Sequence, residues 1–114
     1  ELALVQAIIY LGTAPKSNST YMAEKSARRA AKETGSLVPP MHILNAPTSL
    51  MKDLGYGDGY AYDHGTEEGF SGQNNFPDDM ARAQFYTPVD RGFEREIAKR
   101  LEYWDKLRKS TPEN

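Results

Sequence analysis

The sequence has no cysteine, so disulfides and thiolate metal sites are excluded, and a reducing compartment suits the chain. Long hydrophobic runs are also missing: the longest, Ala7–Leu11, is far too short to span a bilayer. No secretory signal pattern is present. We therefore expect a cytoplasmic protein with no membrane partner.

The motifs of common active sites are missing as well. Lys16 lies in APKSN, which superficially resembles a phosphate-binding loop, but no G-x-x-x-x-G-K-[ST] occurs. One acidic stretch invites a metal hypothesis, yet its spacing fits neither the calcium loop nor H-E-x-x-H. Its members are Asp58, Asp63, His64, Glu67 and Glu68. We predict no catalytic, cofactor-binding or metal-ligating residue in this chain.

A carboxylate-based hydrolase using Asp63, His64 and Glu67 stays open as an alternative. Its signature would be metal-dependent turnover that is lost on changing His64 to Ala. The simpler interpretation is a solvated loop, with His42 and His64 as packing or hydrogen-bonding residues.

The 114 residues form at most one domain, and the net charge of -2 favours no particular partner. The distribution of charge is more informative. Basic residues dominate the first half, whereas every charged side chain from Asp53 to Asp79 is acidic. These regions could attract a polyanion, pair one subunit with another, or simply be solvated faces.

An apolar helix is predicted over Glu1–Leu11, ended by Gly12. Its apolar residues wrap most of the circumference: Leu2, Leu4, Val5, Ile8, Ile9 and Leu11. A helix that is apolar all round must be covered all round, which a domain this small cannot do alone. We expect the cover to come from another subunit or from a missing upstream region, because Glu1 lies inside the pattern as at a cut end.

A second helix is predicted over about Ala14–Thr34, with Thr13 as its cap and Pro15 in its first turn. A stripe of small residues runs along one side: Ala23, Ala27, Ala30 and Ala31. The opposite side carries candidate phosphate-binding residues: Lys25, Arg28, Arg29 and Lys32. The alternative is a solvated helix with an ordinary Glu24–Arg28 contact.

The stretch Val38–Tyr62 predicts a short helix followed by tight turns. Asn45 is the predicted N-cap, Pro47 lies in the first turn, and Gly55 ends the helix. The glycines that follow allow left-handed turns between tyrosines that can pack on neighbours: Gly57, Gly59, Tyr56, Tyr60 and Tyr62.

The remainder predicts an irregular loop over Asp63–Asp79, a helical turn over Pro77–Ala83, and an extended Phe85–Pro88 packed on the tyrosines. Asp90 should cap a final helix. Its apolar stripe is Phe93, Ile97, Leu101, Trp104 and Leu107. Trp104 is a candidate interface anchor, although packing within the chain is the favoured interpretation. We thus predict a mostly α fold, with four to five helices and a long irregular Tyr/Gly-rich segment.

Three motifs in order carry a family resemblance: YLGTAPKSN, HILNAPTSLMKDLGYGDGYAYDH and FYTPVDRGFEREI. Between about Leu2 and Trp104 the chain resembles the C-terminal region of the replication-associated recombination protein A family of AAA+ ATPases. The family is also called maintenance of genome stability protein A, or Werner-helicase-interacting protein. Its ATPase motifs are absent here, so the resemblance implies a fragment.

The resemblance implies that residues 1–114 are a single C-terminal helical tetramerisation domain, like the C-terminal domain of clamp loaders. The AAA+ core, with its ATP and Mg²⁺, would lie upstream and act on DNA at stalled replication forks. Expected partners are the chain itself, DNA through the parent, and replication-fork proteins, in the nucleoid. No catalytic residue of the family can be carried over, so the fragment is predicted not to be an enzyme.

Candidate interface residues are Leu4, Ile8, Ile9 and Trp104. The alternative function is a monomeric nucleic-acid-binding helical module that uses the basic helix 14–34.

Overall fold

The computed structural model describes residues 1–111, and over that range the protein is helical with no strand. Its four α-helices are α1 (Leu2–Thr13), α2 (Ser19–Thr34), α3 (Ser49–Asp53) and α4 (Glu94–Ser110). Two short 3₁₀ turns, η1 (Met41–Ile43) and η2 (Asp63–Gly65), lie between α2 and α4. The predicted mostly α fold with a long irregular segment is confirmed.

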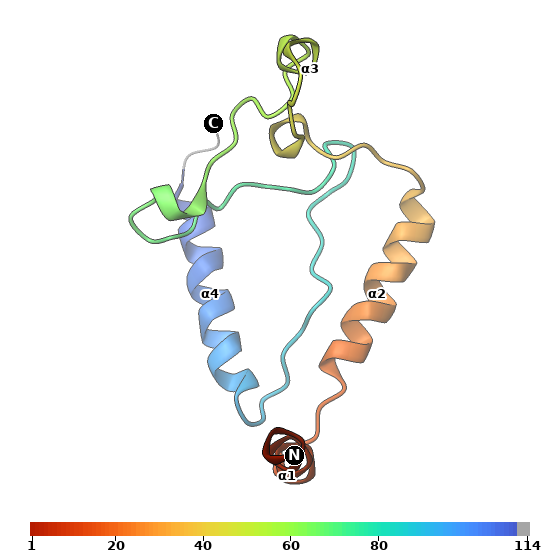
Figure 1. The fold of residues 1–114 in the computed structure, drawn as a ribbon, viewed down its shortest axis with the longest axis vertical. Coiled ribbons are helices and arrows are strands. Elements are labelled where there is room, and N and C mark those ends of the chain that lie inside the picture. The colour runs from red at the N-terminus through yellow and green to blue at the C-terminus, as the bar shows by residue number, and fades with distance from the viewer. Residues whose placement is uncertain (112–114) are drawn as a thin grey trace.

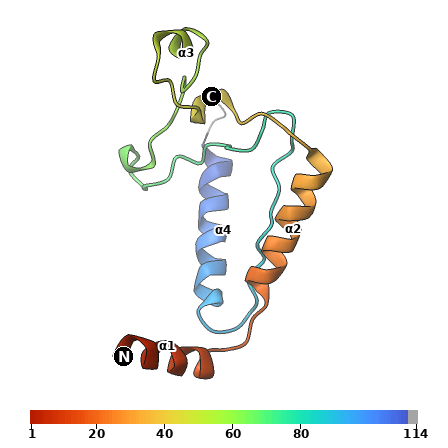
Figure 2. The ribbon, with the colours of Figure 1, turned by 45° about the vertical axis from the view of Figure 1, so that its right-hand side comes forward.

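The helices form an open frame (Figure 1). α2 and α4 are the two uprights, and the extended chain that follows residue 80 runs between them. α1 lies across the foot of the frame, while α3 and the Tyr/Gly-rich segment project from the opposite end (Figure 2).

No two helices of the described chain pack against each other. The radius of gyration is 18.6 Å, whereas a compact domain of this length has about 13 Å. The accessible surface is 9596 Å², against roughly 6,300 Å² for a compact monomer of this size. Within residues 1–111 no hydrophobic side chain is fully buried. The protomer therefore leaves open a large surface that a compact domain would close.

α1 does not end at Gly12, contrary to the prediction. The helix continues to Thr13, because a glycine is tolerated there and the last carbonyls find other donors. The Thr13 hydroxyl donates to the Ile9 carbonyl at 2.7 Å, and Lys16 Nζ donates to the Leu11 carbonyl at 3.2 Å. Thr13 thus ends α1 and does not cap the next helix.

α2 begins at Ser19, so its predicted start at Ala14 was wrong. Residues 14–18 form a non-helical link, and Ser17 Oγ accepts a hydrogen bond from the Ser19 N–H at 3.2 Å. The predicted end is confirmed: Gly35 follows Thr34 with φ +65°.

The N-cap of α3 is Thr48, where Asn45 had been predicted. The Thr48 hydroxyl accepts the Met51 N–H at 3.2 Å, and Pro47 lies before the helix. Because Thr48 is extended and directly precedes the helix, its hydroxyl reaches the first turn. The predicted left-handed turns are confirmed, with Gly55, Gly57 and Gly59 at φ of 87°, 78° and 77°.

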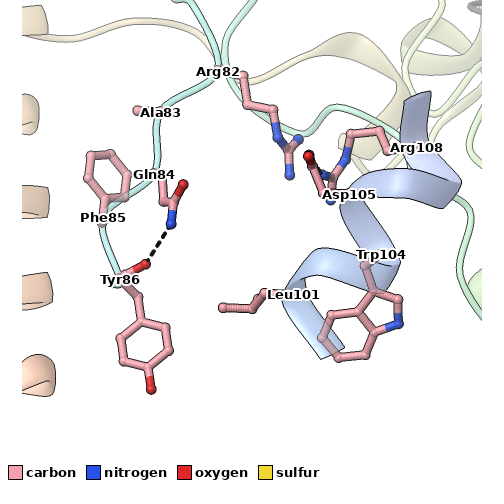
Figure 3. Close-up of a pocket in the computed structure, with 9 residues that line it drawn as sticks. All are labelled: Arg82, Ala83, Gln84, Phe85, Tyr86, Leu101, Trp104, Asp105 and Arg108. Atoms are coloured by element: carbon pink, nitrogen blue, oxygen red, sulfur yellow. Dashed lines mark hydrogen bonds and ion pairs between the residues drawn. The ribbon is translucent and has the colours of Figure 1, made fainter. Parts of the chain in front are cut away.

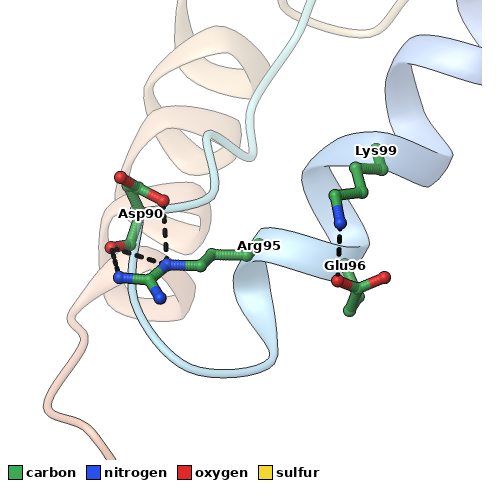
Figure 4. A network of polar contacts seen from close by, with 4 residues as sticks. All are labelled: Asp90, Arg95, Glu96 and Lys99. Atoms are coloured by element: carbon green, nitrogen blue, oxygen red, sulfur yellow. Dashed lines mark hydrogen bonds and ion pairs between the residues drawn. The ribbon is translucent and has the colours of Figure 1, made fainter.

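The C-terminal half differs from the prediction in three details. The helical turn expected over Pro77–Ala83 is shorter and is not helical: it spans residues 77–80 and is closed by the Met80 N–H on the Pro77 carbonyl at 3.0 Å. Phe85–Pro88 is extended as predicted, but Phe85 pairs with Phe76, with ring centroids 6.0 Å apart. Asp90 does not cap α4, because it lies a turn too early; its carboxylate accepts from Arg95 Nε at 2.9 Å (Figure 4).

Candidate functional site

The apolar surface of α1 is contacted by no other helix of residues 1–111. Every residue from Glu1 to Thr13 is exposed, including Leu4 (67%), Ile8 (61%) and Ile9 (59%). We call the following set the α1 surface: Leu2, Leu4, Val5, Ile8, Ile9, Tyr10 and Leu11. The predicted interface residues of α1 thus lie together on a helix that no other helix of the described chain touches.

Full burial of one such side chain is worth about 1.5–3 kcal/mol, so the α1 surface represents on the order of 10 kcal/mol. Physical chemistry therefore favours a state in which other protein covers α1.

Trp104, the other predicted interface residue, lies on α4 at an open cleft of about 490 Å³ (Figure 3). Its ring stacks on Phe70, with centroids 6.0 Å apart and an interplanar angle of 19°. The side chain is still 38% exposed. Trp104 thus packs within the chain, as the favoured interpretation held, and keeps part of its surface free.

Two arginines border this cleft. Arg108 lies over the Phe70 ring, 5.3 Å from its centroid, and donates to Asp105 at 3.2 Å. Burial, and then the nearby charge of Arg108, lowers the pKa of Arg82 from its ordinary value. Asp105 has a lowered pKa, first through a hydrogen bond from Lys109. The cleft is therefore a mixed apolar and basic surface built on α4.

The structure places the four predicted phosphate-binding residues on one exposed face of α2. They are Lys25, Arg28, Arg29 and Lys32. At about 100° per residue, this basic face lies opposite the less exposed side formed by Ala23, Ala27 and Ala30. The alternative contact is also present, since Arg28 pairs with Glu24 at 2.8 Å. Such an exposed pair contributes little to stability.

The acidic stretch forms no metal-binding constellation: across residues 1–111 no three His, Cys, Asp or Glu residues converge on a common point. Hydrogen bonds from Ser71 hold the pKa of Asp63 below its ordinary value. The His64 ring lies 5.1 Å from the Tyr62 ring, and His42 Nε2 is 3.0 Å from Asn75 Oδ1. The predicted packing and hydrogen-bonding roles of both histidines are confirmed.

Sequence reasoning missed a junction at the foot of the frame, where the α1–α2 link meets the start of α4. The Tyr86 hydroxyl donates to Glu94 Oε1 at 2.7 Å. Hydrogen bonds from Ser17, Tyr86 and then Ser19 lower the pKa of Glu94. Ser19 is the most buried polar residue described, at 5% exposed. No periodicity could pair these groups, because they lie in segments far apart in the chain.

Residues 1–105 match the family model described as MgsA AAA+ ATPase C terminal. This chain belongs to that family of AAA+ ATPase C-terminal helical domains, which confirms the resemblance drawn from its three motifs. No helix within residues 1–111 is both long enough and apolar enough to cross a membrane.

Several relatives of this chain carry the name Replication-associated recombination protein A. It is 44% identical over 108 residues to the Replication-associated recombination protein A of Coxiella burnetii, covering 94% of this chain and 24% of the relative. The protein of that name from Escherichia coli K12 is 40% identical over 113 residues, covering 98% and 25%. ATPase WRNIP1 of Dictyostelium discoideum is 38% identical over 66 residues, covering 58% and 8%. The chain thus spans about a quarter of the length of the first two.

Proposed function

We propose that this chain is the assembly module of a clamp-loader-like AAA+ ATPase that acts on DNA at stalled replication forks. It joins copies of the parent into a homotetramer by covering the α1 surface. The single observation that carries this proposal is the exposure of α1 around its whole circumference. The names of the relatives, which place them in replication and recombination, support the setting.

The size of the open surface fits an obligate assembly. The protomer exposes 9596 Å², roughly 3,300 Å² more than a compact monomer of this size would. Obligate interfaces bury about 2,000–5,000 Å² in total and are more hydrophobic than transient ones. The seven exposed apolar side chains of the α1 surface have that character.

We assign nucleotide binding and assembly to different parts of the parent. Nucleotide and Mg²⁺ would be held by the AAA+ core upstream, because this chain carries no phosphate-binding loop. Its own contribution would be to hold several cores at fixed spacing around DNA, in the cytoplasm and at the nucleoid. Replication-fork proteins would be further partners of the parent.

The test is to measure the mass of the full-length parent by light scattering across a dilution series, in low salt and in about 1 M salt. We expect a tetramer that persists at high salt, since apolar burial is not screened. A monomer at high micromolar concentration in both salts would contradict the proposal. Dissociation by salt alone would move the interface from the α1 surface to charged patches.

A second candidate is nucleic-acid binding through the basic face of α2. The observation that supports this candidate is that three basic residues are exposed and form no ion pair within residues 1–111: Lys25, Arg29 and Lys32. Each phosphate contact adds about 0.9 to the logarithmic salt slope of binding to duplex DNA. Arg28→Glu with Arg29→Glu should weaken binding and flatten that slope, whereas Lys106→Glu on α4 should not. A slope unchanged by the double substitution would exclude this face as a DNA contact.

A further inference from the structure

The open cleft beside α4, which we call the α4 cleft, has aromatic side chains on both of its walls. Its volume of about 490 Å³ lies within the range of about 300–1,000 Å³ that small-molecule sites occupy. One wall is α4, with Leu101 and Trp104, and the other is the extended chain, with Phe85 and Tyr86 (Figure 3). Trp104 stacks on Phe70 and still keeps 38% of its surface exposed. A flat ring that enters the cleft would thus meet apolar and aromatic surface on two sides.

The lining of the α4 cleft carries more positive than negative charge. Arg82 and Arg108 both line it, and the only carboxylate among its lining residues is that of Asp105. This carboxylate is already shared, because it pairs with Arg108 at 3.2 Å and with Lys109 at 2.7 Å. Arg82 forms no ion pair within residues 1–111. The cleft therefore offers a positive charge to an anionic ligand.

Neither of the two guanidinium groups is fully satisfied within the chain. The Arg108 Nε is buried and has no hydrogen-bond partner among residues 1–111. Burial, and then the charge of Arg108, lowers the pKa of Arg82, because both disfavour its protonated form. An anion in the cleft would reduce this repulsion and supply acceptors. The planar fork of a guanidinium matches phosphate oxygens in particular.

The extended chain opposite α4 adds further hydrogen-bond donors. The backbone N–H groups of residues 81–87 make no hydrogen bond to another backbone group of the described chain. The Gln84 side chain donates to the Tyr86 carbonyl at 3.1 Å (Figure 3), so this carbonyl of the wall is paired. Backbone N–H groups are frequent contacts of phosphate oxygens in nucleic-acid complexes. This wall thus favours a ligand that brings acceptors.

Flat aromatic surface beside arginines and N–H donors is the combination that recognises a base joined to a phosphate. We propose that the α4 cleft binds a nucleoside phosphate, with its base between the two walls and its phosphate at Arg82 and Arg108. Such a ligand is either a free nucleotide or one unit of a single strand. An acidic peptide would match the arginines but would leave the facing aromatic walls without a flat partner. The site lies on α4 and does not depend on assembly through α1.

The test is photo-crosslinking of the full-length parent with iododeoxyuridine, whose base crosslinks to nearby aromatic side chains. The probes are iododeoxyuridine monophosphate and a single strand of about eight nucleotides that carries one such base. Peptide mapping locates the bound base even though the AAA+ core is expected to hold nucleotide elsewhere. We expect crosslinked peptides that contain Trp104, Tyr86 or Phe85. Crosslinks confined to α2 or to the core would overturn the proposal.

The two probes also distinguish the sources of the ligand. Crosslinks in the α4 cleft with both probes would support a site that takes a free nucleotide. Crosslinks there with the strand alone would support a site for single-stranded nucleic acid. Absence of crosslinks in the cleft with both probes would overturn the proposal.

A matched pair of arginines makes the result specific. Arg82 lies 5.7 Å from the centroid of the Phe76 ring, and Arg100 lies 5.6 Å from that of Phe93. Only Arg82 lines the cleft. Arg82→Glu should weaken binding of the crosslinking probe by about tenfold or more, whereas Arg100→Glu should change it less than about twofold. Equal losses in the two variants would overturn the proposal.

Circular dichroism shows whether Arg82→Glu keeps its helices. If it does not, Arg82→Gln removes the charge alone, and unchanged binding in that variant would overturn the proposal as well. Competition then separates nucleotide from peptide. Excess thymidine monophosphate should displace the monophosphate probe, and a short polyglutamate peptide should not. Displacement by the peptide alone would contradict the proposal and would assign the cleft to an acidic peptide.

Discussion

α1 (12 residues) and α4 (17 residues) are both several turns long, but they relate to the rest of the chain in opposite ways. One side of α4 contacts the rest of the chain. Trp104 stacks on Phe70, and a Cβ placed on Gly72 would lie 3.6 Å from the Arg108 Cα. α1 has no such side, and all of its residues are exposed. The comparison teaches that α4 is held by contacts within the chain, whereas α1 contacts no other helix of residues 1–111 and keeps its apolar surface free.

The largest expected effect is on the α1 surface. Ile8→Glu would place an unpaired carboxylate where apolar surface is to be covered, which costs about 3 kcal/mol or more per site. This corresponds to association weakened more than about a hundredfold. Light scattering over a dilution series measures it, with Lys106→Glu on the exposed side of α4 as the control. Equal masses for Ile8→Glu and the parent would place the α1 surface outside the interface.

The next effect compares the glycines of the two regions. Gly92→Ala forces a Cβ into a left-handed residue and against Pro15, so we expect a loss of about 2 kcal/mol in the free energy of unfolding. Gly12→Ala lies within α1 with nothing within 4 Å of its Cβ, and should stabilise the helix by about 0.5–1 kcal/mol. Denaturant unfolding of the two variants measures both changes in the free energy of unfolding, a loss for Gly92→Ala and a gain for Gly12→Ala. Similar effects from the two alanines would remove the distinction between the strained contact at Gly92 and the open helix position at Gly12.

A smaller effect is expected at the α4 cleft. Trp104→Ala removes the stacked pair with Phe70 and part of the cleft wall, at a cost of about 1.5 kcal/mol. Tyr103→Ala is the matched control, because this neighbour is 52% exposed and should cost less than about 0.5 kcal/mol. The measurement is again denaturant unfolding. Should Trp104→Ala also change the mass of the assembly, the tryptophan would be an interface anchor after all.

The smallest effect is on the pH dependence of stability that Glu94 contributes. Hydrogen bonds from Ser17 and then Tyr86 lower the pKa of Glu94, so the folded state favours the ionised carboxylate. Its contribution to stability is present above the ordinary glutamate pKa and is lost as the pH falls through the lowered value. Glu94→Gln should therefore show a shallower loss of stability on acidification than the parent. Identical acid profiles would mean that the carboxylate makes no favourable contacts.

The sequence allowed the helices to be predicted because their patterns are local. The small and apolar residues on one side of α2, and the wholly apolar α1, follow from residues a turn apart. The predicted helix starts were wrong where the sequence offers more than one candidate for the N-cap position. Thr48 caps α3 in place of Asn45, and Phe93, not Asp90, directly precedes α4. The approach of Pro15 to Gly92 could not be predicted, since these residues meet only through the tertiary path of the chain.

Some residues of the candidate site were likewise predictable from the sequence, and others were not. Leu4, Ile8 and Ile9 were predictable as an uncovered surface because composition alone leaves them without partners. The clustering of Lys25, Arg28, Arg29 and Lys32 followed from helical spacing. The stacking of Trp104 on Phe70 did not, because Phe70 lies in an irregular loop with no period to place it.

The most direct test of assembly through α1 is photo-crosslinking from Ile8 in the full chain. A photoreactive phenylalanine analogue replaces Ile8, and isotopically heavy and light copies are mixed before assembly and irradiation. The account predicts crosslinked peptides that join a heavy copy to a light copy. Crosslinks found only within single copies would contradict it and would show that the chain covers α1 by itself.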